Sequence, residues 1–228
     1  MFFFNRNNKI TISLSYYNDA KFLHKQLSSF ASYPDNIDIQ IIDDGSQIFP
    51  IENYLNQIQD KISVYKIIED IKWNIPGVRN LGAMLSPNPW ILHLDMDQII
   101  PLKTIIKISK LKLNPMKYYI FNRKLENKTK FTTGTILLNK KPFWDCGGYD
   151  EDFAGIYGHN DPYLKEKLKI IGVKQVRLKN FWINDYQNEA SCDLSRSDSE
   201  INKSLMKKKL HEKNFFSKCI RFNWKKIK

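Results

Sequence analysis

Over the first 115 positions, the spacing of the hydrophobic residues alternates between that of strands and that of helices. Short hydrophobic runs with β-branched residues or alternation are typical of strands. Segments between and after them place apolar residues at helical spacing, as Phe22, Leu23 and Leu27 do. We expect strands at residues 9–15, 37–42, 62–68 and 90–94, and helices at residues 19–32, 50–59, 76–85 and 101–111. This order predicts an α/β fold in which helices cover both faces of a mostly parallel sheet.

The pattern changes after residue 115. Residues 117–122 and 130–138 indicate strands without a helix between them, so the sheet should be mixed. Helical spacing returns only at residues 160–171, which Gly172 ends. We expect a loop at residues 143–158, a short strand at 172–178 and a mobile loop at 184–200.

Length and composition limit the possible classes of protein. A chain of 228 residues with 42% hydrophobic residues suits one large α/β domain. The apolar start, residues 1–4, is too short for a signal peptide, and no run approaches the 18 residues of a transmembrane helix. Three cysteines without CxxC spacing predict neither a disulfide framework nor a zinc site, which favours a cytoplasmic location.

Most of the net charge of +12 lies at the C-terminal end. Residues 203–228 hold ten Lys or Arg and one acidic residue, and aromatic residues are interleaved with the basic ones. This basic aromatic tail could bind an anionic membrane surface or, less specifically, nucleic acid. Alternatively, it is a terminal helix whose aromatic side chains pack on the domain.

Polar side chains follow several of the predicted strands. Asp95 and Asp97 come directly after the strand at residues 90–94, while Ser15 and Asp44 end two earlier strands. Ligands of parallel sheets gather at the carboxyl ends of strands. Paired carboxylates there can bind Mg²⁺ or Mn²⁺ and leave positions for phosphate oxygens. The alternative for this pair is a solvated acidic turn.

Five short motifs occur in order along residues 9–172. Together they resemble glycosyltransferase family 2, whose members use nucleotide sugars and have the GT-A fold. The motifs are Ser15-Tyr16-Tyr17-Asn18, Ile41-Ile42-Asp43-Asp44-Gly45-Ser46, Gly77-Val78-Arg79-Asn80-Leu81-Gly82, Leu94-Asp95-Met96-Asp97 and Gly147-Gly148-Tyr149-Asp150-Glu151-Asp152-Phe153. The resemblance implies a Rossmann-like mixed sheet with a nucleotide-binding half at about residues 9–100 and an acceptor half at about 101–183. Residues 184–228 would be the mobile loop and tail.

The resemblance assigns donor-binding roles to residues near the strand ends. Asp44 would accept a hydrogen bond from the nucleotide base, Tyr17 would stack on that base, and Ser15 would bind the nucleotide from the same loop. Arg79 would reach a phosphate or the edge of the base. Plain packing is the alternative for Tyr17, and a surface salt bridge is the alternative for Arg79.

By the same resemblance, Asp95 contacts the ribose and Asp97 holds Mn²⁺ or Mg²⁺, with Asp95 beside it. Related enzymes often add a His after the last core strand as a further metal ligand, and this chain has none there. Asp185 is the candidate substitute.

The acceptor half should contain the catalytic base. The family often has G-x-E-D at a helix start, where this chain has Gly158-His159-Asn160-Asp161. Asp161 is therefore the candidate base, although Asp followed by Pro162 also suits a helix N-cap. Asn160 replaces the Glu and could bind hydroxyl groups. Trp144 and Tyr149 are further acceptor-binding candidates, because aromatic faces suit sugar C–H surfaces.

These observations predict a metal-dependent, inverting glycosyltransferase. The donor would be a nucleoside-diphosphate sugar, with UDP-type favoured, and the acceptor a hydroxyl of a glycan or lipid-linked glycan. We expect a cytoplasmic protein, peripheral on the inner face of the membrane if the tail binds there, and no specific nucleic-acid partner. The alternative is a non-catalytic nucleotide-sugar-binding or membrane-associated scaffold.

Overall fold

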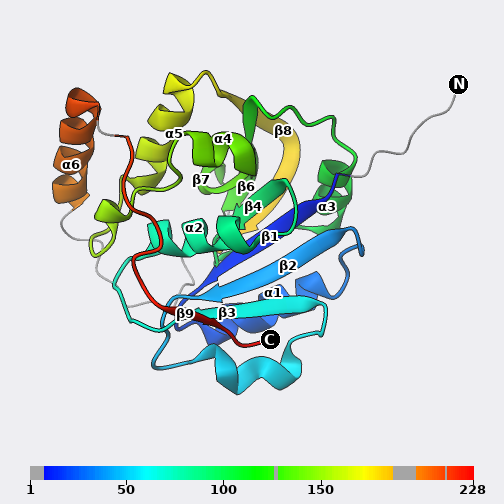
Figure 1. Ribbon diagram of the computed structural model, residues 1–228. Helices are drawn as coiled ribbons and strands as arrows, with labels where there is room; N and C mark the ends of the chain where they lie inside the picture. Colours follow the sequence, from blue (N-terminus) through cyan, green and yellow to red (C-terminus); the bar gives the residue numbers. More distant parts are fainter. Residues whose placement is uncertain (1–7, 126–127, 187–198, 214) are drawn as a thin grey trace, which may run out of the picture.

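A nine-stranded sheet forms the centre of the computed structural model, which describes residues 8–125, 128–186, 199–213 and 215–228 (Figure 1). The strand order is β5-β8-β6-β7-β4-β1-β2-β3-β9. Strand β1 pairs in parallel with β2 and β4, and β2 with β3, whereas β7 runs antiparallel to both β4 and β6. The strands are β1 (Ile10–Tyr16), β2 (Ile37–Asp43), β3 (Ile62–Ile67), β4 (Trp90–Leu94), β5 (Gln98–Ile99), β6 (Lys117–Leu125), β7 (Lys128–Asn139), β8 (Lys174–Asp185) and β9 (Trp224–Lys226). The predicted mixed α/β sheet is confirmed.

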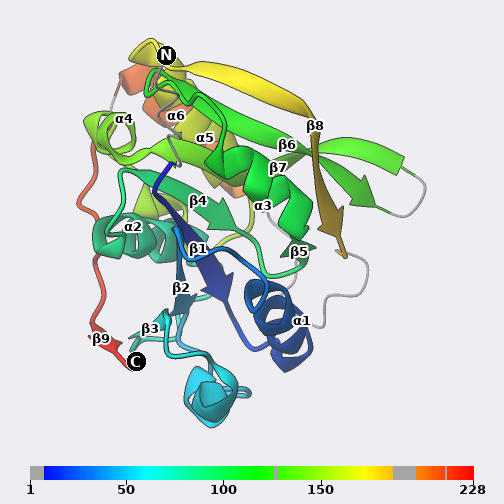
Figure 2. The same cartoon turned by 90° about the vertical axis from the view of Figure 1, so that its right-hand side faces the viewer.

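Helices lie on both faces of this sheet (Figure 2). Because side chains alternate along a strand, each strand contributes one set of residues to each face. Hydrophobic contacts place α1, η1 and α3 on one face and α2, α4 and α5 on the other. The helices are α1 (Ala20–Phe30), η1 (Ile51–Gln57), α2 (Ile75–Leu85), α3 (Leu102–Ser109), α4 (Lys140–Asp145), η2 (Glu151–Phe153), α5 (Asn160–Ile170) and α6 (Ser199–Glu212).

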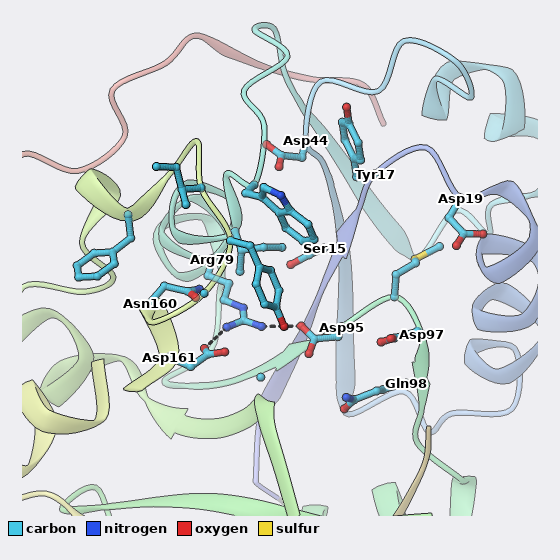
Figure 3. A pocket seen from close by; sticks show the side chains of 18 of the residues that line it. Ser15, Tyr17, Asp19, Asp44, Arg79, Asp95, Asp97, Gln98, Asn160 and Asp161 are labelled. Atoms are coloured by element: carbon cyan, nitrogen blue, oxygen red, sulfur yellow. Dashed lines mark hydrogen bonds and ion pairs between the residues drawn. The ribbon is translucent and has the colours of Figure 1, made fainter. Parts of the chain in front are cut away.

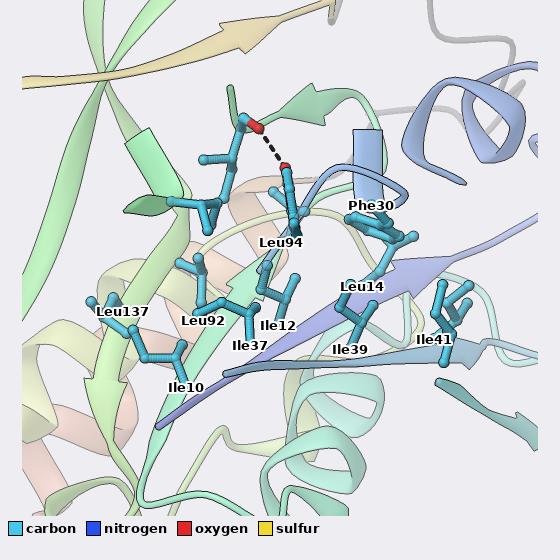
Figure 4. Close-up of a cluster of buried hydrophobic side chains, with 14 of the residues drawn as sticks. Ile10, Ile12, Leu14, Phe30, Ile37, Ile39, Ile41, Leu92, Leu94 and Leu137 are labelled. Carbon is cyan, nitrogen blue, oxygen red and sulfur yellow. Dashed lines mark hydrogen bonds between the residues drawn. The ribbon is translucent and has the colours of Figure 1, made fainter. Parts of the chain in front are cut away.

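The larger hydrophobic cluster lies between the sheet and α1 (Figure 4). Ile12, Leu14 and Leu92 of the central strands are fully buried there and pack with Phe30 of α1. Fully burying side chains of this size contributes roughly 1.5–3 kcal/mol each. This packing holds the central parallel strands together, so their carboxyl ends lie at one edge of the sheet.

The C-terminal segment differs from the tail expected from its composition. It passes along α2 and ends as β9, which pairs antiparallel with β3 at the sheet edge (Figure 1). Phe222 is buried against α2, and Lys209 forms ion pairs with Asp150 and Asp152 at 2.7 and 2.6 Å. These contacts favour the alternative in which aromatic residues of the tail pack on the domain. None of the helices in the described ranges has the length and hydropathy needed to cross a bilayer.

Several expected elements have different limits in the structure. The helix expected at 50–59 is the 3₁₀ helix η1, and the loop expected at 143–158 contains the end of α4 and all of η2. Strand β8 continues to Asp185, well beyond the expected end at 178. Most of the loop expected at 184–200 lies outside the described residues. Helix α4 is only six residues long, and its start depends on Asn139, which accepts from Lys141 N at 3.0 Å.

Candidate active site

A cavity of about 500 Å³ opens at the carboxyl ends of β1, β2 and β4 (Figure 3). It lies at the strand ends because the parallel strands all end at this edge of the sheet and the helices that follow them turn away. Eight of the predicted site residues line it: Ser15, Tyr17, Asp44, Arg79, Asp95, Asp97, Asn160 and Asp161. The structure therefore brings together residues that are up to about 150 positions apart in the sequence.

Asp44 lines the cavity, whereas its neighbour Asp43 supports the turn. Asp43 accepts hydrogen bonds from Ser46 N at 2.9 Å and Ile51 N at 3.1 Å. Burial raises the pKa of Asp43 to about 6, although these hydrogen bonds oppose the shift. Burial also raises the pKa of Asp44 well above its usual range, against the hydrogen bond that Asn74 Nδ2 donates at 3.0 Å.

Gly45 completes this turn. It has a φ of +71°, and an added Cβ would lie 2.4 Å from the carbonyl oxygen of Glu69. Only glycine fits such a conformation and so close an approach of the backbone. The turn that presents Asp44 therefore requires a glycine at this position.

Tyr17 lies at the cavity wall, just after β1 ends. Its hydroxyl group donates a hydrogen bond to Asp70 Oδ1 at 3.0 Å, which ties the β1 loop to the segment before α2. Ser15, near the end of β1, lines the same wall. Both residues therefore line the cavity, where the sequence predicted them.

Arg79 sits between the two most important predicted carboxylates (Figure 3). Its Nη2 lies 2.5 Å from Asp95 Oδ1, and its Nη1 forms an ion pair with Asp161 Oδ1. The Arg79 side chain is only 2% exposed. Burial alone would lower the pKa of this guanidinium, but Asp161, Tyr149 and Asp95 raise it well above its usual range. Arg79 thus lines the cavity as expected, but its guanidinium is held by carboxylates in a buried ion pair rather than a surface one.

Gly134 of β7 leaves room for this ion pair. A Cβ at this position would lie 2.1 Å from Asp95 Oδ2 and 2.9 Å from Arg79 Nη2. The sequence pattern predicted a strand here but gave no reason to single out its glycine. Its importance depends on a close approach that only the folded structure creates.

Asp161 lies inside the first turn of α5, one residue after Asn160 begins the helix. The N-cap is His159, in the left-handed conformation at φ 63° and without a side-chain capping bond. The alternative assignment of Asp161 as an N-cap is therefore wrong. Its carboxylate instead contacts Arg79 and accepts a hydrogen bond from the Tyr149 hydroxyl at 2.9 Å.

The predicted metal ligands are only partly brought together. Asp95 and Asp97 both line the cavity, and their oxygen donors fit Mg²⁺ or Mn²⁺ if phosphate oxygens and water complete the coordination. Within the described ranges, no group of three or more His, Cys, Asp or Glu side chains could hold a metal ion. The buried carboxylate of Asp185 is bound by Arg123 Nη1 at 2.8 Å and Gln98 Nε2 at 3.3 Å. The expected third ligand is thus not assembled with the other two.

The two aromatic acceptor candidates do not line the cavity. Trp144 packs edge-on against Phe143, with ring centroids 4.8 Å apart, next to the cluster beneath α4 and α5. Tyr149 is fully buried in that cluster. Neither position supports direct contact with an acceptor, because the hydrophobic core, rather than the cavity, takes up both rings.

Sequence reasoning missed Trp73, which forms an aromatic pair with Tyr157 in the cavity wall. Trp73, from the segment before α2, and Tyr157, from the loop before α5, both line the cavity, and their ring centroids are 4.8 Å apart. The pair joins the two halves of the chain. Trp73 has a positive φ of 49°, which is unusual for a bulky residue. No local sequence pattern indicates this conformation.

No family model and no curated protein sequence matches this chain. Its fold is nevertheless similar to solved glycosyltransferase structures. S. aureus TarS residues 1–349, in complex with UDP-GlcNAc, gives a TM-score of 0.64 at 13% identity over 87% of this chain and 65% of that one. The mannosyltransferase PcManGT from Pyrobaculum calidifontis, with GDP-Man and Mn²⁺, gives 0.62 at 13% identity over 78% and 56%.

GalNAc-T7, with UDP, GalNAc and Mn²⁺, also gives a TM-score of 0.62 at 13% identity, over 78% of this chain and 44% of that one. The chain thus spans only about half to two-thirds of the length of these proteins. At such low identity the similarity concerns the fold, and it confirms the GT-A architecture expected from the motifs.

Proposed function

We propose that this protein is a glycosyltransferase that moves a sugar from a nucleoside diphosphate to a hydroxyl group of an acceptor. One observation carries the proposal: Asp95 and Asp97 at the end of β4 share a cavity with Asp161 of α5. Paired carboxylates suit a cation on a diphosphate, and a third carboxylate across the cavity suits a base. The GT-A fold supports the same function.

The donor would lie along the carboxyl ends of the strands. Asp44 and Ser15 would bind the nucleotide, Tyr17 would stack on its base, and Asp95 would contact the ribose. Asp97, with Asp95 beside it, would hold Mn²⁺ or Mg²⁺. When bound, this ion would neutralise charge on the departing diphosphate.

Transfer would proceed with inversion. Asp161 would accept the proton of an acceptor hydroxyl, whose oxygen forms a bond to the anomeric carbon. The bond from that carbon to the diphosphate oxygen breaks, and its electron pair leaves with the nucleoside diphosphate. General-base action of this kind typically contributes about 10²–10⁴-fold in rate.

We favour a UDP-type donor and a glycan or lipid-linked acceptor, and a role in polysaccharide assembly at the inner face of the membrane. Although Phe222 of the tail packs on the domain, Phe216 and Trp224 are exposed, as are the basic Lys225 and Lys226. These exposed residues support a peripheral position, because basic residues near an anionic surface each contribute roughly 1 kcal/mol. Charge alone does not select a sugar or a linkage.

Thermal unfolding with a panel of nucleoside-diphosphate sugars tests the proposal directly. We expect one donor, present with Mn²⁺ at roughly 100 times its Kd, to stabilise the wild type by about 2.7 kcal/mol. Asp97→Ala should lose this stabilisation. Asp145→Ala, which removes an exposed carboxylate paired with Lys141, should retain it.

Two results would count against the proposal. If no donor in the panel stabilises the wild type, the donor site is wrong; if stabilisation is the same without Mn²⁺, the metal role is wrong. Release of nucleoside diphosphate by the wild type then separates an enzyme from a scaffold that only binds the donor.

A further inference from the structure

Tyr149 holds an unusual position behind the cavity. Its side chain is fully buried, and its hydroxyl group accepts a hydrogen bond from Arg79 Nη1 at 2.8 Å while donating one to Asp161 Oδ1 at 2.9 Å. The hydroxyl is therefore bonded to both members of the buried ion pair. A fully buried tyrosine whose only polar atom joins a cation to a carboxylate has a fixed orientation.

The backbone of Tyr149 is fixed as firmly as its side chain. Asn80 donates to the Tyr149 carbonyl oxygen at 2.9 Å and accepts from the Tyr149 backbone N–H at 2.8 Å. The ring packs against Phe143 and, edge-on, against His93, both with centroids 5.9 Å away. Arg79 and Asn80 are adjacent residues of α2. Arg79 thus binds the hydroxyl group of Tyr149, and Asn80 binds its backbone.

These contacts make the two oxygens of Asp161 unequal. Oδ1 receives hydrogen bonds from both Arg79 and Tyr149, whereas no hydrogen bond from the described residues reaches Oδ2. Asp161 lines the cavity, and its side chain is 17% exposed. When hydrogen bonds hold a carboxylate at one oxygen, the lone pairs of the other oxygen can accept a proton.

We propose that Tyr149 is a positioning residue that, with Arg79, fixes Asp161 through Oδ1 so that Oδ2 accepts the acceptor's proton. This inference rests on the proposed function, because it concerns the same base. It replaces the expected contact between Tyr149 and the acceptor. It also explains why a tyrosine, and not phenylalanine, occupies a fully buried core position.

The charge state of the hydroxyl group suits this role. Burial raises the pKa of Tyr149 well above its usual range, so the phenol keeps its proton and remains a donor to Asp161. Arg79 is the cation that contacts both Tyr149 and Asp161, and Lys165, one turn further along α5, places a second positive charge near Asp161.

Tyr149→Phe removes the hydroxyl and keeps the ring, which makes it the decisive variant. The probe is the nucleoside-diphosphate sugar that stabilises the wild type best, with Mn²⁺ and with water as acceptor, and release of nucleoside diphosphate is measured. We expect kcat to fall by roughly 10- to 100-fold, the loss typical of a misplaced reacting group, while KM for the donor is unchanged.

Tyr118→Phe is the matched control. Tyr118 belongs to the same buried cluster, but its hydroxyl donates to Gln175 at 2.9 Å, away from Asp161. We expect both kcat and KM of this variant to stay near wild-type values. A similar fall in kcat for both tyrosine variants would mean that lost packing, and not positioning, explains the effect.

A double-mutant cycle with Asp161→Asn separates this inference from the proposed function. If Tyr149 acts through Asp161, Tyr149→Phe should lower kcat much less in the Asp161→Asn variant than it does in the wild-type protein. Full additivity would overturn the positioning role. Unchanged turnover in Asp161→Asn alone would instead remove the base, and a wild type that releases no nucleoside diphosphate would remove both.

A crystal structure of Tyr149→Phe provides a readout that does not depend on activity. We expect the Asp161 carboxylate to turn away from the position that the tyrosine hydroxyl group fixes. An unchanged carboxylate together with unchanged kcat would contradict the inference.

Discussion

The two sides of the cavity are built in different ways. On the side proposed to bind the donor, Ser15, Asp44 and Asp95 lie where parallel strands end, so the sheet itself aligns them. On the side proposed to bind the acceptor, Asp161 lies in the first turn of a helix that follows an irregular loop, and its carboxylate contacts Arg79 and Tyr149. The donor side is thus set by topology, and the acceptor side by a buried polar network.

This difference shows where the two sides depend on each other. Helix α2 belongs to the donor half, yet Arg79 and Asn80 reach across to hold the acceptor-side loop. Arg79 contacts Asp95 on one side and Asp161 on the other. A change on one side should therefore reach the other mainly through this arginine.

Replacing Arg79 should have the largest effect on the link between the two sides of the cavity. Arg79→Met leaves Asp95 and Asp161 partly buried without their cation, and removing one partner of a buried pair costs about 3–5 kcal/mol. Urea unfolding should show this loss in the free energy of unfolding. Arg79→Lys should lose less, because the charge remains although the two-sided geometry does not.

Arg221→Met is the control for that experiment. Arg221 pairs with Asp152 where both side chains are more than a third exposed, so its loss should cost no more than about 1 kcal/mol. Equal losses for the two variants would show that Arg79 does not join the two sides.

The turn that carries Asp44 should depend on pH in a defined way. The folded state raises the pKa of Asp43 from 3.8 to about 6, so it binds this proton more tightly than the unfolded chain does. The resulting stability is fully present below about pH 4 and is lost as the pH rises through 6. This group should contribute roughly 2–3 kcal/mol more at pH 4 than at pH 7.

Asp43→Asn isolates that contribution, because the amide does not titrate. Between pH 7 and pH 4, the free energy of unfolding of the wild type should rise by that amount relative to that of the variant. The contributions of other titrating groups are the same in both proteins and cancel. A difference that stays constant between pH 7 and pH 4 would show that the turn does not depend on Asp43 protonation.

Gly134→Ala should have a smaller effect on stability than Arg79→Met but a specific effect on binding. The added methyl group would meet Asp95 Oδ2, and we expect a loss of roughly 1–2 kcal/mol because the carboxylate can turn toward the cavity. Calorimetry should also show weaker donor binding with Mn²⁺. Gly155→Ala is the control. Gly155 has a φ of +91° and an added Cβ there would have no neighbour within 4 Å, so the variant introduces backbone strain without touching Asp95. Normal donor binding by Gly134→Ala would separate this glycine from the site.

The sequence predicted the donor side better than the acceptor side. Asp44 and Asp95 follow strands whose hydrophobic pattern is clear, and parallel topology then implies that they meet. Tyr149 was expected to face the acceptor, because nothing local distinguishes a buried aromatic ring from one that lines a cavity. Asp185 was expected near the metal, but Arg123, whose side chain comes from another strand, binds its carboxylate.

The C-terminal tail shows the same limit of local information. Ten basic residues with interleaved aromatics resemble a membrane-binding segment, yet Phe222 is buried and β9 completes the sheet edge. Composition records which side chains are present. It does not record that acidic residues 150–152 and the open edge of β3 are available to bind them.

The sequence by itself determined the alternation of strands and helices and the order of the motifs, because hydrophobic period and turn chemistry are local properties of the chain. Only the tertiary structure decided that Arg79 lies between Asp95 and Asp161, that the Tyr149 hydroxyl donates a hydrogen bond to Asp161, and that Gly134 leaves room for the ion pair. These contacts join residues far apart in the chain, and their geometry follows from how the core packs, which no local pattern encodes.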